Sequence, residues 1–198
     1  YQCLGQIFCF PGFQAEKLRE HLSGRSNVTV VENPRYKWTG TMYGLSLLEG
    51  KVEGGFLLLK SDLVFEQKGV SALLESESPC SALLAEPSAP RRGRGEVRIS
   101  KDIHQINRIQ GEMTGVVKLS EEVFRRMLSY FSENENPYLN YEYVLENIGR
   151  LYRFRGVMVD DLVWSKVETS RQYEMLVNIL YPRIQRKETQ MREKLAAD

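Results

Sequence analysis

The stretch that most constrains the fold is residues 54–66, GGFLLLKSDLVFE. Its apolar run, residues 56–59, follows two glycines and ends in the polar step Lys60-Ser61-Asp62. A continuous apolar run of this length is typical of a parallel strand that is covered on both faces. A carboxylate just past such a strand lies where open α/β sheets bind ligands. Asp62 is therefore a candidate metal-holding carboxylate, with capping of the next turn or helix as the alternative.

The composition is that of an ordinary soluble protein with a single domain, residues 1–198. Of these residues, 42% are hydrophobic and 27% are charged, which allows a core of ordinary size. A net charge of +1 gives no overall electrostatic attraction to nucleic acid or to a membrane surface. No apolar run reaches the ~20 residues of a membrane span. We therefore expect neither partner, and we recognise no signal peptide.

Cysteine and histidine are too few for a disulfide scaffold or a Cys/His metal site. The three cysteines lack the spacing of zinc ligands, and the two histidines, His21 and His104, are far apart in the chain. Disulfide-rich proteins belong to oxidising compartments. The sequence therefore favours a cytoplasmic location.

The first half of the chain reads as alternating strands and helices. Strands are predicted at residues 4–10 and 27–31, with a helix at residues 14–22 between them, which has the length of one crossover unit. Further helices are predicted at residues 42–50 and 68–74, on either side of the strand described above. This order indicates an α/β fold with a doubly wound, mostly parallel mixed sheet.

Small and hydroxyl residues, Thr39-Gly40-Thr41, precede the predicted helix at residues 42–50. Backbone N–H groups at the start of a helix can hold a phosphate or a base edge, because they have no partner within the helix. Ordinary capping by Thr39 or Thr41 explains the same pattern. Both interpretations stay open on the sequence alone.

Residues 76–96 interrupt the alternation. Their prolines and serines predict a Pro/Ser/Arg-rich loop or a partly disordered insertion. The basic cluster of Arg91, Arg92 and Arg94 can meet a phosphate or an acidic partner, although such short clusters are more often solvated loops.

Further elements follow this loop. Short strands are predicted at residues 96–99, 104–109 and 113–119, and Ser120 is expected to cap the next helix. A second helix at residues 141–148 and a strand at residues 152–157 complete this part.

Residues 158–173 place a second carboxylate at the end of a strand. Residues 163–167 alternate as in a strand, Glu168 ends it, and Thr169 with Gln172 has the spacing of a capping box. Asp62 and Glu168 therefore stand at equivalent steps, each expected to precede a helix. Two such carboxylates can share one Mg²⁺, with phosphate oxygens and waters as the other ligands.

Taken in order, four segments resemble nucleotidyltransferases of the sugar-nucleotide type. Residues 30–46 resemble the family's strand and Asn-Pro loop, and residues 55–65 resemble its strand with the metal aspartate. Residues 111–120 resemble its Glu-x-x-Gly strand, and residues 159–183 resemble its ending from Asp-Asp-Leu to Tyr-Pro. Within this group they look most like the choline-phosphate and aminoethylphosphonate cytidylyltransferases. The resemblance implies a Rossmann-like nucleotidyltransferase fold and covers most of the chain outside residues 76–100.

The resemblance also implies roles for single residues. Asp62 and Glu168 would hold the catalytic Mg²⁺, with Glu168 at a position where the family usually has Asp. The nucleotide would lie near Asp62 and near a segment composed of Thr39, Gly40 and Thr41. The acceptor side would include Glu112, Asp160, Asp161 and Trp164. The Trp164 indole could stack on a cationic head group, whereas its apolar neighbours favour a place in the core.

One family feature is absent from these residues. Family members begin with a strand and a Gly-rich loop that cradles the triphosphate, and the residues from Tyr1 onward match from the family's second strand. We interpret the sequence as a fragment of a longer enzyme or as a degenerate homologue. We accordingly expect the 198 residues alone to show poor or no turnover of CTP with phosphocholine.

The reaction implied by the resemblance is transfer of a nucleotidyl group, CMP from CTP, to a phosphate or phosphonate acceptor such as phosphocholine, with release of pyrophosphate. The partners would then be a nucleoside triphosphate and a small phosphorylated acceptor. Two alternatives remain: a non-catalytic truncated homologue that acts as a binding or interaction module, and a sugar-phosphate nucleotidyltransferase. The oligomeric state is left open, with a homodimer among the options.

Overall fold

The computed structural model describes residues 5–85, 112–149, 151–152 and 154–197. These residues form two compact units, which we call the first unit (Tyr1–Gly54 and Phe124–Ile148) and the second unit (Gly55–Val123 and Gly149–Asp198). The single-domain organisation expected from the sequence stays a prediction. Within the described ranges, no helix is long and apolar enough to cross a membrane.

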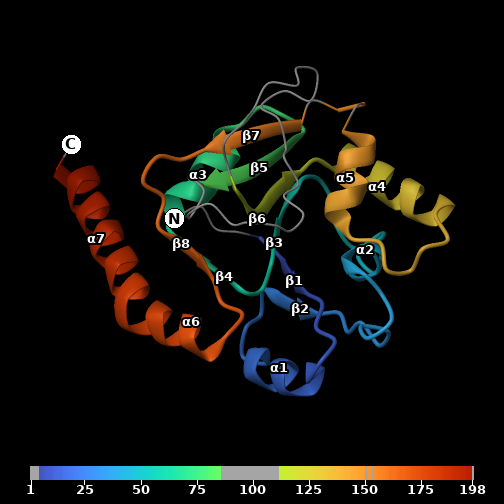
Figure 1. Ribbon diagram of the computed structural model, residues 1–198, viewed down its shortest axis with the longest axis horizontal. Coiled ribbons are helices and arrows are strands. Elements are labelled where there is room, and N and C mark those ends of the chain that lie inside the picture. Colours follow the sequence, from blue (N-terminus) through green and yellow to red (C-terminus); the bar gives the residue numbers. More distant parts are fainter. Residues whose placement is uncertain (1–4, 86–111, 150, 153, 198) are drawn as a thin grey trace. The chain divides into compact units, whose positions relative to one another are not determined.

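The first unit begins with the predicted crossover. Strands β1 (Ile7–Cys9) and β2 (Val28–Val30) pair in parallel, and α1 (Ala15–Leu22) connects them (Figure 1). Helices α2 (Thr41–Ser46), α4 (Glu121–Glu133, from Phe124 on) and α5 (Tyr141–Ile148) form its remaining part. Its buried side chains come mainly from these three helices: Met42, Leu45, Phe124, Met127, Tyr141, Val144, Leu145 and Ile148.

The second unit contains a four-stranded sheet in the order β3-β6-β5-β7. These strands are β3 (Phe56–Leu59), β6 (Glu112–Leu119), β5 (Cys80–Ala85) and β7 (Phe154–Met158). Strand β6 runs antiparallel to β3 and β5, and β5 and β7 are parallel, so three of the four strands point the same way. The mixed, mostly parallel sheet predicted from the sequence is confirmed.

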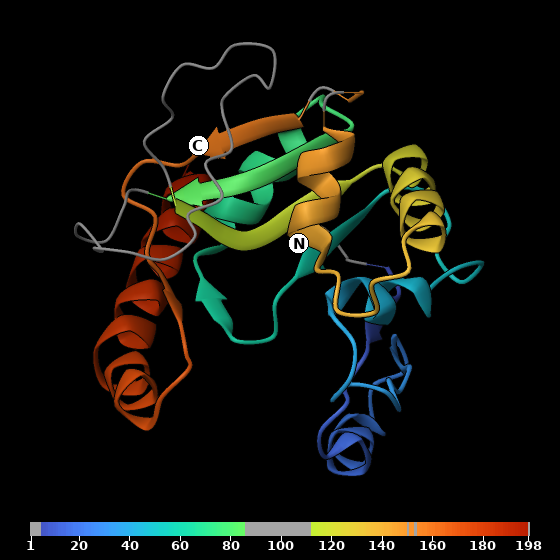
Figure 2. The same ribbon diagram turned by 45° about the vertical axis from the view of Figure 1, so that its right-hand side comes forward.

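The loop predicted at residues 76–96 is wrong for residues 80–85, whereas residues 76–79 belong to no helix or strand, as predicted. Residues Cys80–Ala85 form β5, an inner strand whose six residues are all buried (Figure 2). The apolar run is covered on both faces, while Pro79 lies just before it and therefore costs no ladder hydrogen bond. The remainder of this loop, the arginines at 91, 92 and 94 and the strands predicted at residues 96–99 and 104–109 lie outside the described residues.

The strand at residues 56–59 forms as predicted, but its environment differs. Strand β3 is at an edge of the four-stranded sheet and pairs antiparallel with β6. Of its four residues only Leu58 is buried, and Leu59 is exposed. The expectation of a parallel strand covered on both faces is therefore wrong, because an apolar run also suits a half-covered edge when other elements shield part of it.

A small apolar core joins the sheet to helix α3 (Gln67–Glu75). Leu73, Leu83 and Val116 are completely buried at its centre. Gly69 of α3 lies so close to Leu83 that a Cβ there would be 2.7 Å from a Leu83 methyl carbon. The glycine therefore allows α3 to pack tightly on β5.

The C-terminal segment of the second unit is one continuous helical run. It consists of α6 (Ser170–Met175), the π-helical turn η1 (Leu176–Leu180) and α7 (Tyr181–Ala197). A separate two-stranded antiparallel ladder pairs β4 (Leu63–Phe65), which follows β3 in the chain, with β8 (Trp164–Lys166), which precedes α6.

Candidate active site

Asp62 lies in the short turn between β3 and β4. The apolar residues that follow it find a partner strand in β8, where Leu63 pairs with Lys166 and Phe65 with Trp164. The expectation that Asp62 precedes a helix is therefore wrong: β4 follows it. Beyond the ladder, the Val167 N–H donates to the Asp62 carbonyl oxygen at 2.8 Å. This pairing fixes the Asp62 turn beside residues 166–168.

The structure brings Asp62 and Glu168 to the same ammonium group. Lys166 Nζ lies 3.6 Å from Asp62 Oδ2 and donates a hydrogen bond to Glu168 Oε1. The hydrogen bond to Glu168, helped by the charge of Asp62, raises the pKa of Lys166, so this side chain is cationic at neutral pH. The two carboxylates predicted to share a cation therefore already share one that belongs to the protein.

One oxygen of Asp62 has no partner of its own. Asp62 Oδ1 is buried and makes no hydrogen bond to any described residue. A buried carboxylate oxygen without a hydrogen-bond partner lowers the stability of the fold, and a bound ligand would provide the missing partner. Together with the oxygens of Glu168 it forms the kind of donor set that Mg²⁺ prefers, one or two carboxylates completed by phosphates and waters.

The described residues contain no group of three or more His, Cys, Asp or Glu side chains that could hold a metal. A site for a zinc-like ion enclosed by protein ligands is therefore not found in them. Two carboxylates still fit Mg²⁺, because this ion keeps several waters and takes the rest of its ligands from a substrate.

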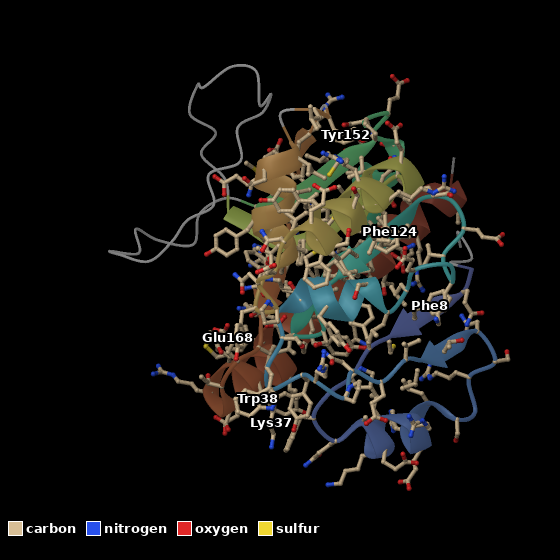
Figure 3. The ribbon with its side chains drawn as sticks, turned by 90° about the vertical axis from the view of Figure 1, so that its right-hand side faces the viewer. Phe8, Lys37, Trp38, Phe124, Tyr152 and Glu168 are labelled. Carbon is tan, nitrogen blue, oxygen red and sulfur yellow. The ribbon has the colours of Figure 1, made fainter. Side chains whose placement is uncertain are left out.

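Glu168 occupies the step between β8 and α6, and its side chain is 54% exposed (labelled in Figure 3). The predicted capping box forms with a shift of one residue. Thr169 Oγ1 accepts from the Gln172 N–H at 3.2 Å, as predicted, whereas Gln172 Oε1 accepts from the N–H of Glu168, the residue before the N-cap, at 2.8 Å. The cap holds the Glu168 backbone in place while leaving its carboxylate at the surface. Removing such a cap typically costs ~1 kcal/mol.

Gly115 of the Glu-x-x-Gly segment approaches the Asp62 turn. Its carbonyl accepts from the Lys60 N–H at 3.2 Å, and its φ of 95° belongs to the left-handed region. A Cβ at Gly115 would lie 3.1 Å from side-chain atoms of Lys60 and Leu63. The left-handed φ is therefore the reason that glycine is needed here, and a side chain would in addition press on Lys60 and Leu63. Glu112 begins β6, and its side chain lies outside the described part.

Asp161 is tied to the C-terminal helix. Its carboxylate contacts Lys187 Nζ at 2.6 Å and Arg183 Nη2 at 3.5 Å. The hydrogen bond and charge of Lys187 hold the pKa of Asp161 below its usual value. Asp160, in contrast, is exposed, and its carbonyl accepts from Lys68 Nζ at 2.8 Å. Of the two predicted acceptor aspartates, Asp161 is thus already paired with cations of the chain.

Glu66 is a buried carboxylate that the sequence did not single out. It is 3% exposed, and Oε2 accepts from the Val163 N–H at 2.8 Å. The ammonium groups of Lys68 and Lys187 lie 3.4 and 3.2 Å from its two oxygens. The sequence offers one signal for this group of Glu66, Lys68 and Lys187: Glu66 directly follows the apolar run of β4 and stands two positions before Lys68.

Trp164 is half-buried and lies in register with Phe65 in the β4–β8 ladder. This exposure fits neither a fully buried core residue nor a free surface ring. Its contact with an acceptor stays a prediction.

The N–H groups of Gly40, Thr41 and Met42, at the start of α2, are occupied. Gly40 donates to the Pro137 carbonyl at 2.8 Å and Thr41 to Asn140 Oδ1 at 3.0 Å. The Met42 N–H likewise donates to the Leu139 carbonyl at 3.1 Å. The expectation of N–H groups free to hold a phosphate is therefore wrong, because the loop before α5 takes them. Nucleotide contact by Thr39, Gly40 and Thr41 stays a prediction, and it no longer has the support of free N–H groups.

The Asp161 pairing has a testable pH dependence. Because the pKa of Asp161 is lowered in the folded protein, its stabilising contribution is present above the unfolded value of ~3.9 and is lost as the pH falls through the folded value. We expect Asp161→Asn to lower the urea midpoint at pH 7 and to have a smaller effect near pH 3. Asparagine tolerates the left-handed φ of 51° found at this position.

Asp160→Asn is the matched control, since it removes the same charge from the neighbouring residue, which makes no ion pair within the described ranges. The interpretation fails if the Asp161→Asn effect on the urea midpoint is the same at both pH values, or if Asp160→Asn reproduces it.

No protein-family model matches the sequence. Among solved structures, the chain is similar to the inositol-1-phosphate CTP transferase from T. maritima, with 18% identity and a TM-score of 0.70, over 91% of this chain and 77% of that one. It is similar to the CTP:phosphocholine cytidylyltransferase from Streptococcus pneumoniae, with 12% identity and a TM-score of 0.68, over 90% and 80% of the two chains.

A third similar structure comes from Bacillus anthracis and carries the provisional name glucose-1-phosphate thymidylyltransferase. It has 16% identity and a TM-score of 0.62, over 85% of this chain and 73% of that one. At these identities the likeness concerns the fold. The nucleotidyltransferase fold implied by the sequence resemblance is confirmed.

Proposed function

We propose that this protein is a Mg²⁺-dependent nucleotidyltransferase that transfers CMP from CTP to a phosphate or phosphonate oxygen of a small acceptor such as phosphocholine. The observation that carries the proposal is the convergence of Asp62 and Glu168 on one cation, Lys166, in a chain with the fold of known nucleotidyltransferases.

The proposed chemistry needs no nucleophile from the protein. The acceptor oxygen attacks the α-phosphorus of the nucleotide, a new P–O bond forms, and the bond to pyrophosphate breaks. When bound, Mg²⁺ would neutralise the phosphate oxygens on which charge develops. Asp62, with its unpartnered Oδ1, and Glu168 would hold the ion, and the hydrogen bond between Val167 and Asp62 would keep the two at a fixed spacing.

The acceptor assignment rests on the resemblance and on the position of Trp164. This half-buried residue stands two positions before Lys166 in β8. An indole face near the carboxylates suits a quaternary or primary ammonium, an attraction of about 0.5–2 kcal/mol. Asp160, which is exposed, can add a negative charge there, whereas the Asp161 carboxylate is engaged by Lys187. Thr39, Gly40, Thr41 and Glu112 are proposed contacts only by resemblance.

The test measures pyrophosphate release by the natural protein in its full length with Mg²⁺. Each of CTP, UTP, dTTP and GTP is combined with phosphocholine, aminoethylphosphonate, inositol 1-phosphate or glucose 1-phosphate, and ³¹P NMR identifies the product. We expect a cytidine product with phosphocholine or aminoethylphosphonate, and a loss of about 100-fold in kcat for Asp62→Asn because a metal ligand is removed.

The alternatives give different results in the same experiment. A thymidine or uridine product with glucose 1-phosphate would make the protein a sugar-phosphate nucleotidyltransferase, as the Bacillus anthracis similarity would suggest. Absence of pyrophosphate with every pair, in a folded protein, would refute the proposal in favour of a non-catalytic binding module.

A further inference from the structure

We propose that Lys166 is an internal counter-cation that holds the Asp62–Glu168 pair together without metal and weakens the binding of a divalent ion by competing for the same two carboxylates. This inference rests on the proposed function, because it concerns the site assigned there to Mg²⁺. A lysine at the end of a short strand would ordinarily be a solvated side chain, and nothing in the sequence marks Lys166 as part of the site.

The backbone determines where the Lys166 ammonium lies. Lys166 pairs with Leu63, the residue after Asp62, in the β4–β8 ladder, and the next residue, Val167, donates to the Asp62 carbonyl. Glu168 is two residues further along the same segment, so its side chain leaves the same side as that of Lys166. The ammonium is therefore placed between the carboxylates by the strand pairing, independently of any ligand.

Its position has an electrostatic consequence. An ammonium 3.6 Å from Asp62 Oδ2 and hydrogen-bonded to Glu168 offsets the repulsion between two carboxylates that would otherwise be close. A divalent ion that takes both carboxylates must displace this ammonium or lie beside it, and each course lowers the affinity for the ion. Among the described residues, Lys166 is the only cation that contacts both carboxylates.

Displacement is feasible because the lysine is only partly covered. Its side chain is 41% exposed, and its flexible stem lets the ammonium turn into water while the strand stays in place. Lys166 therefore weakens the site without blocking it. A metal that arrives with a phosphate is favoured over the free ion, since the phosphate supplies oxygens that the ammonium does not contest and can itself pair with the released lysine.

The experiment titrates Mn²⁺, used as the spectroscopic substitute for Mg²⁺, into the natural protein in its full length without nucleotide, and follows the free ion by EPR. Removal of a unit charge this close is expected to make Lys166→Met bind Mn²⁺ at least about tenfold more tightly than the wild-type chain. Lys166→Arg, which keeps the charge, is expected to bind as weakly as the wild-type chain.

Two controls identify the cause and the place. Lys51→Met removes the same charge from an exposed residue of the first unit and should not change the affinity for Mn²⁺. Asp62→Asn in the Lys166→Met background should abolish the gain. Thermal unfolding adds a second readout: without metal, Lys166→Met should unfold at a lower temperature than the wild-type chain, and Mn²⁺ should raise its midpoint more.

The inference is overturned if Lys166→Met binds Mn²⁺ no more tightly than the wild-type chain, or if Lys51→Met gains as much. It is also overturned if Lys166→Arg gains as much as Lys166→Met, since the charge would then not be responsible. Failure of the proposed function is distinguishable, because it would show as absent turnover in a protein whose Mn²⁺ affinity still responds to Lys166→Met.

Discussion

Lys187→Met is expected to lower the free energy of unfolding by about 3 kcal/mol, because it leaves the buried Glu66 carboxylate short of one of its two counter-cations. Glu66 is 3% exposed, and Lys187 lies 3.2 Å from its Oε1. The loss stays at the lower end of the range for broken buried pairs, since Lys68 and the Val163 N–H still contact Oε2. Urea unfolding at pH 7, followed by circular dichroism, measures it.

The control for this prediction comes from the same helix. Lys194→Met removes an exposed lysine of α7 and should change the unfolding free energy by less than ~0.5 kcal/mol. The double variant Glu66→Gln/Lys187→Met should lose less than the sum of the single variants, since the two side chains interact. Equal effects of Lys187→Met and Lys194→Met would mean that Glu66 does not depend on Lys187.

The residues around Glu66 also connect helix α7 to other parts of the second unit. Glu188, one residue after Lys187, accepts from the Gln67 N–H at 3.0 Å and so satisfies a donor in the first turn of α3. Lys187 itself reaches both Glu66 and Asp161. The charged face of α7 therefore binds the C-terminal helix to the beginning of α3 and to residues 160–163, which precede the strand carrying Lys166.

The elements that the sequence predicted well are those determined by neighbouring residues. The strand at residues 56–59, the helix at residues 141–148 and the Thr169 capping box all depend on side chains within a few positions of one another. The β-α-β crossover at the start of the chain also follows from local pattern and length.

The features that the sequence did not predict depend on distant partners. Strand β5 was hidden in a Pro- and Ser-rich stretch because its burial comes from β6 and β7. The N–H groups of Gly40 and Thr41 are satisfied by a loop about 100 residues away, which no local signal reveals. Asp62 follows strand β3, as the sequence indicates, but the strand that pairs with β4 and places Lys166 beside Asp62 is β8, which comes much later in the chain.

Gly40→Ala is expected to destabilise the first unit by about 3 kcal/mol, through steric overlap rather than backbone strain. The backbone of Gly40, with φ −81°, is one that alanine adopts freely. A Cβ would, however, overlap the carbonyl oxygens of Tyr138 and Leu139, and backbone atoms cannot turn aside as a flexible side chain can. Hydrogen–deuterium exchange of α2 and α5, together with urea unfolding, measures the loss.

Gly24→Ala is the matched control, because a Cβ there meets no atom within 4 Å. The overlap at Gly40 matters since five hydrogen bonds join the two segments around it. They run from the Gly40 N–H to Pro137, from the Thr41 N–H and the Thr41 hydroxyl to Asn140, from the Met42 N–H to Leu139, and from the Tyr141 N–H to Thr41 Oγ1 at 2.9 Å. If Gly40→Ala unfolds at the same urea concentration as Gly24→Ala, the loops are not held as closely as described. If Gly40→Ala unfolds at a lower urea concentration than Gly24→Ala, residues 39–41 have a structural role in joining the two segments. Any loss of nucleotide binding in Gly40→Ala must then be compared with that of a stable Thr39 variant before it is assigned to direct contact.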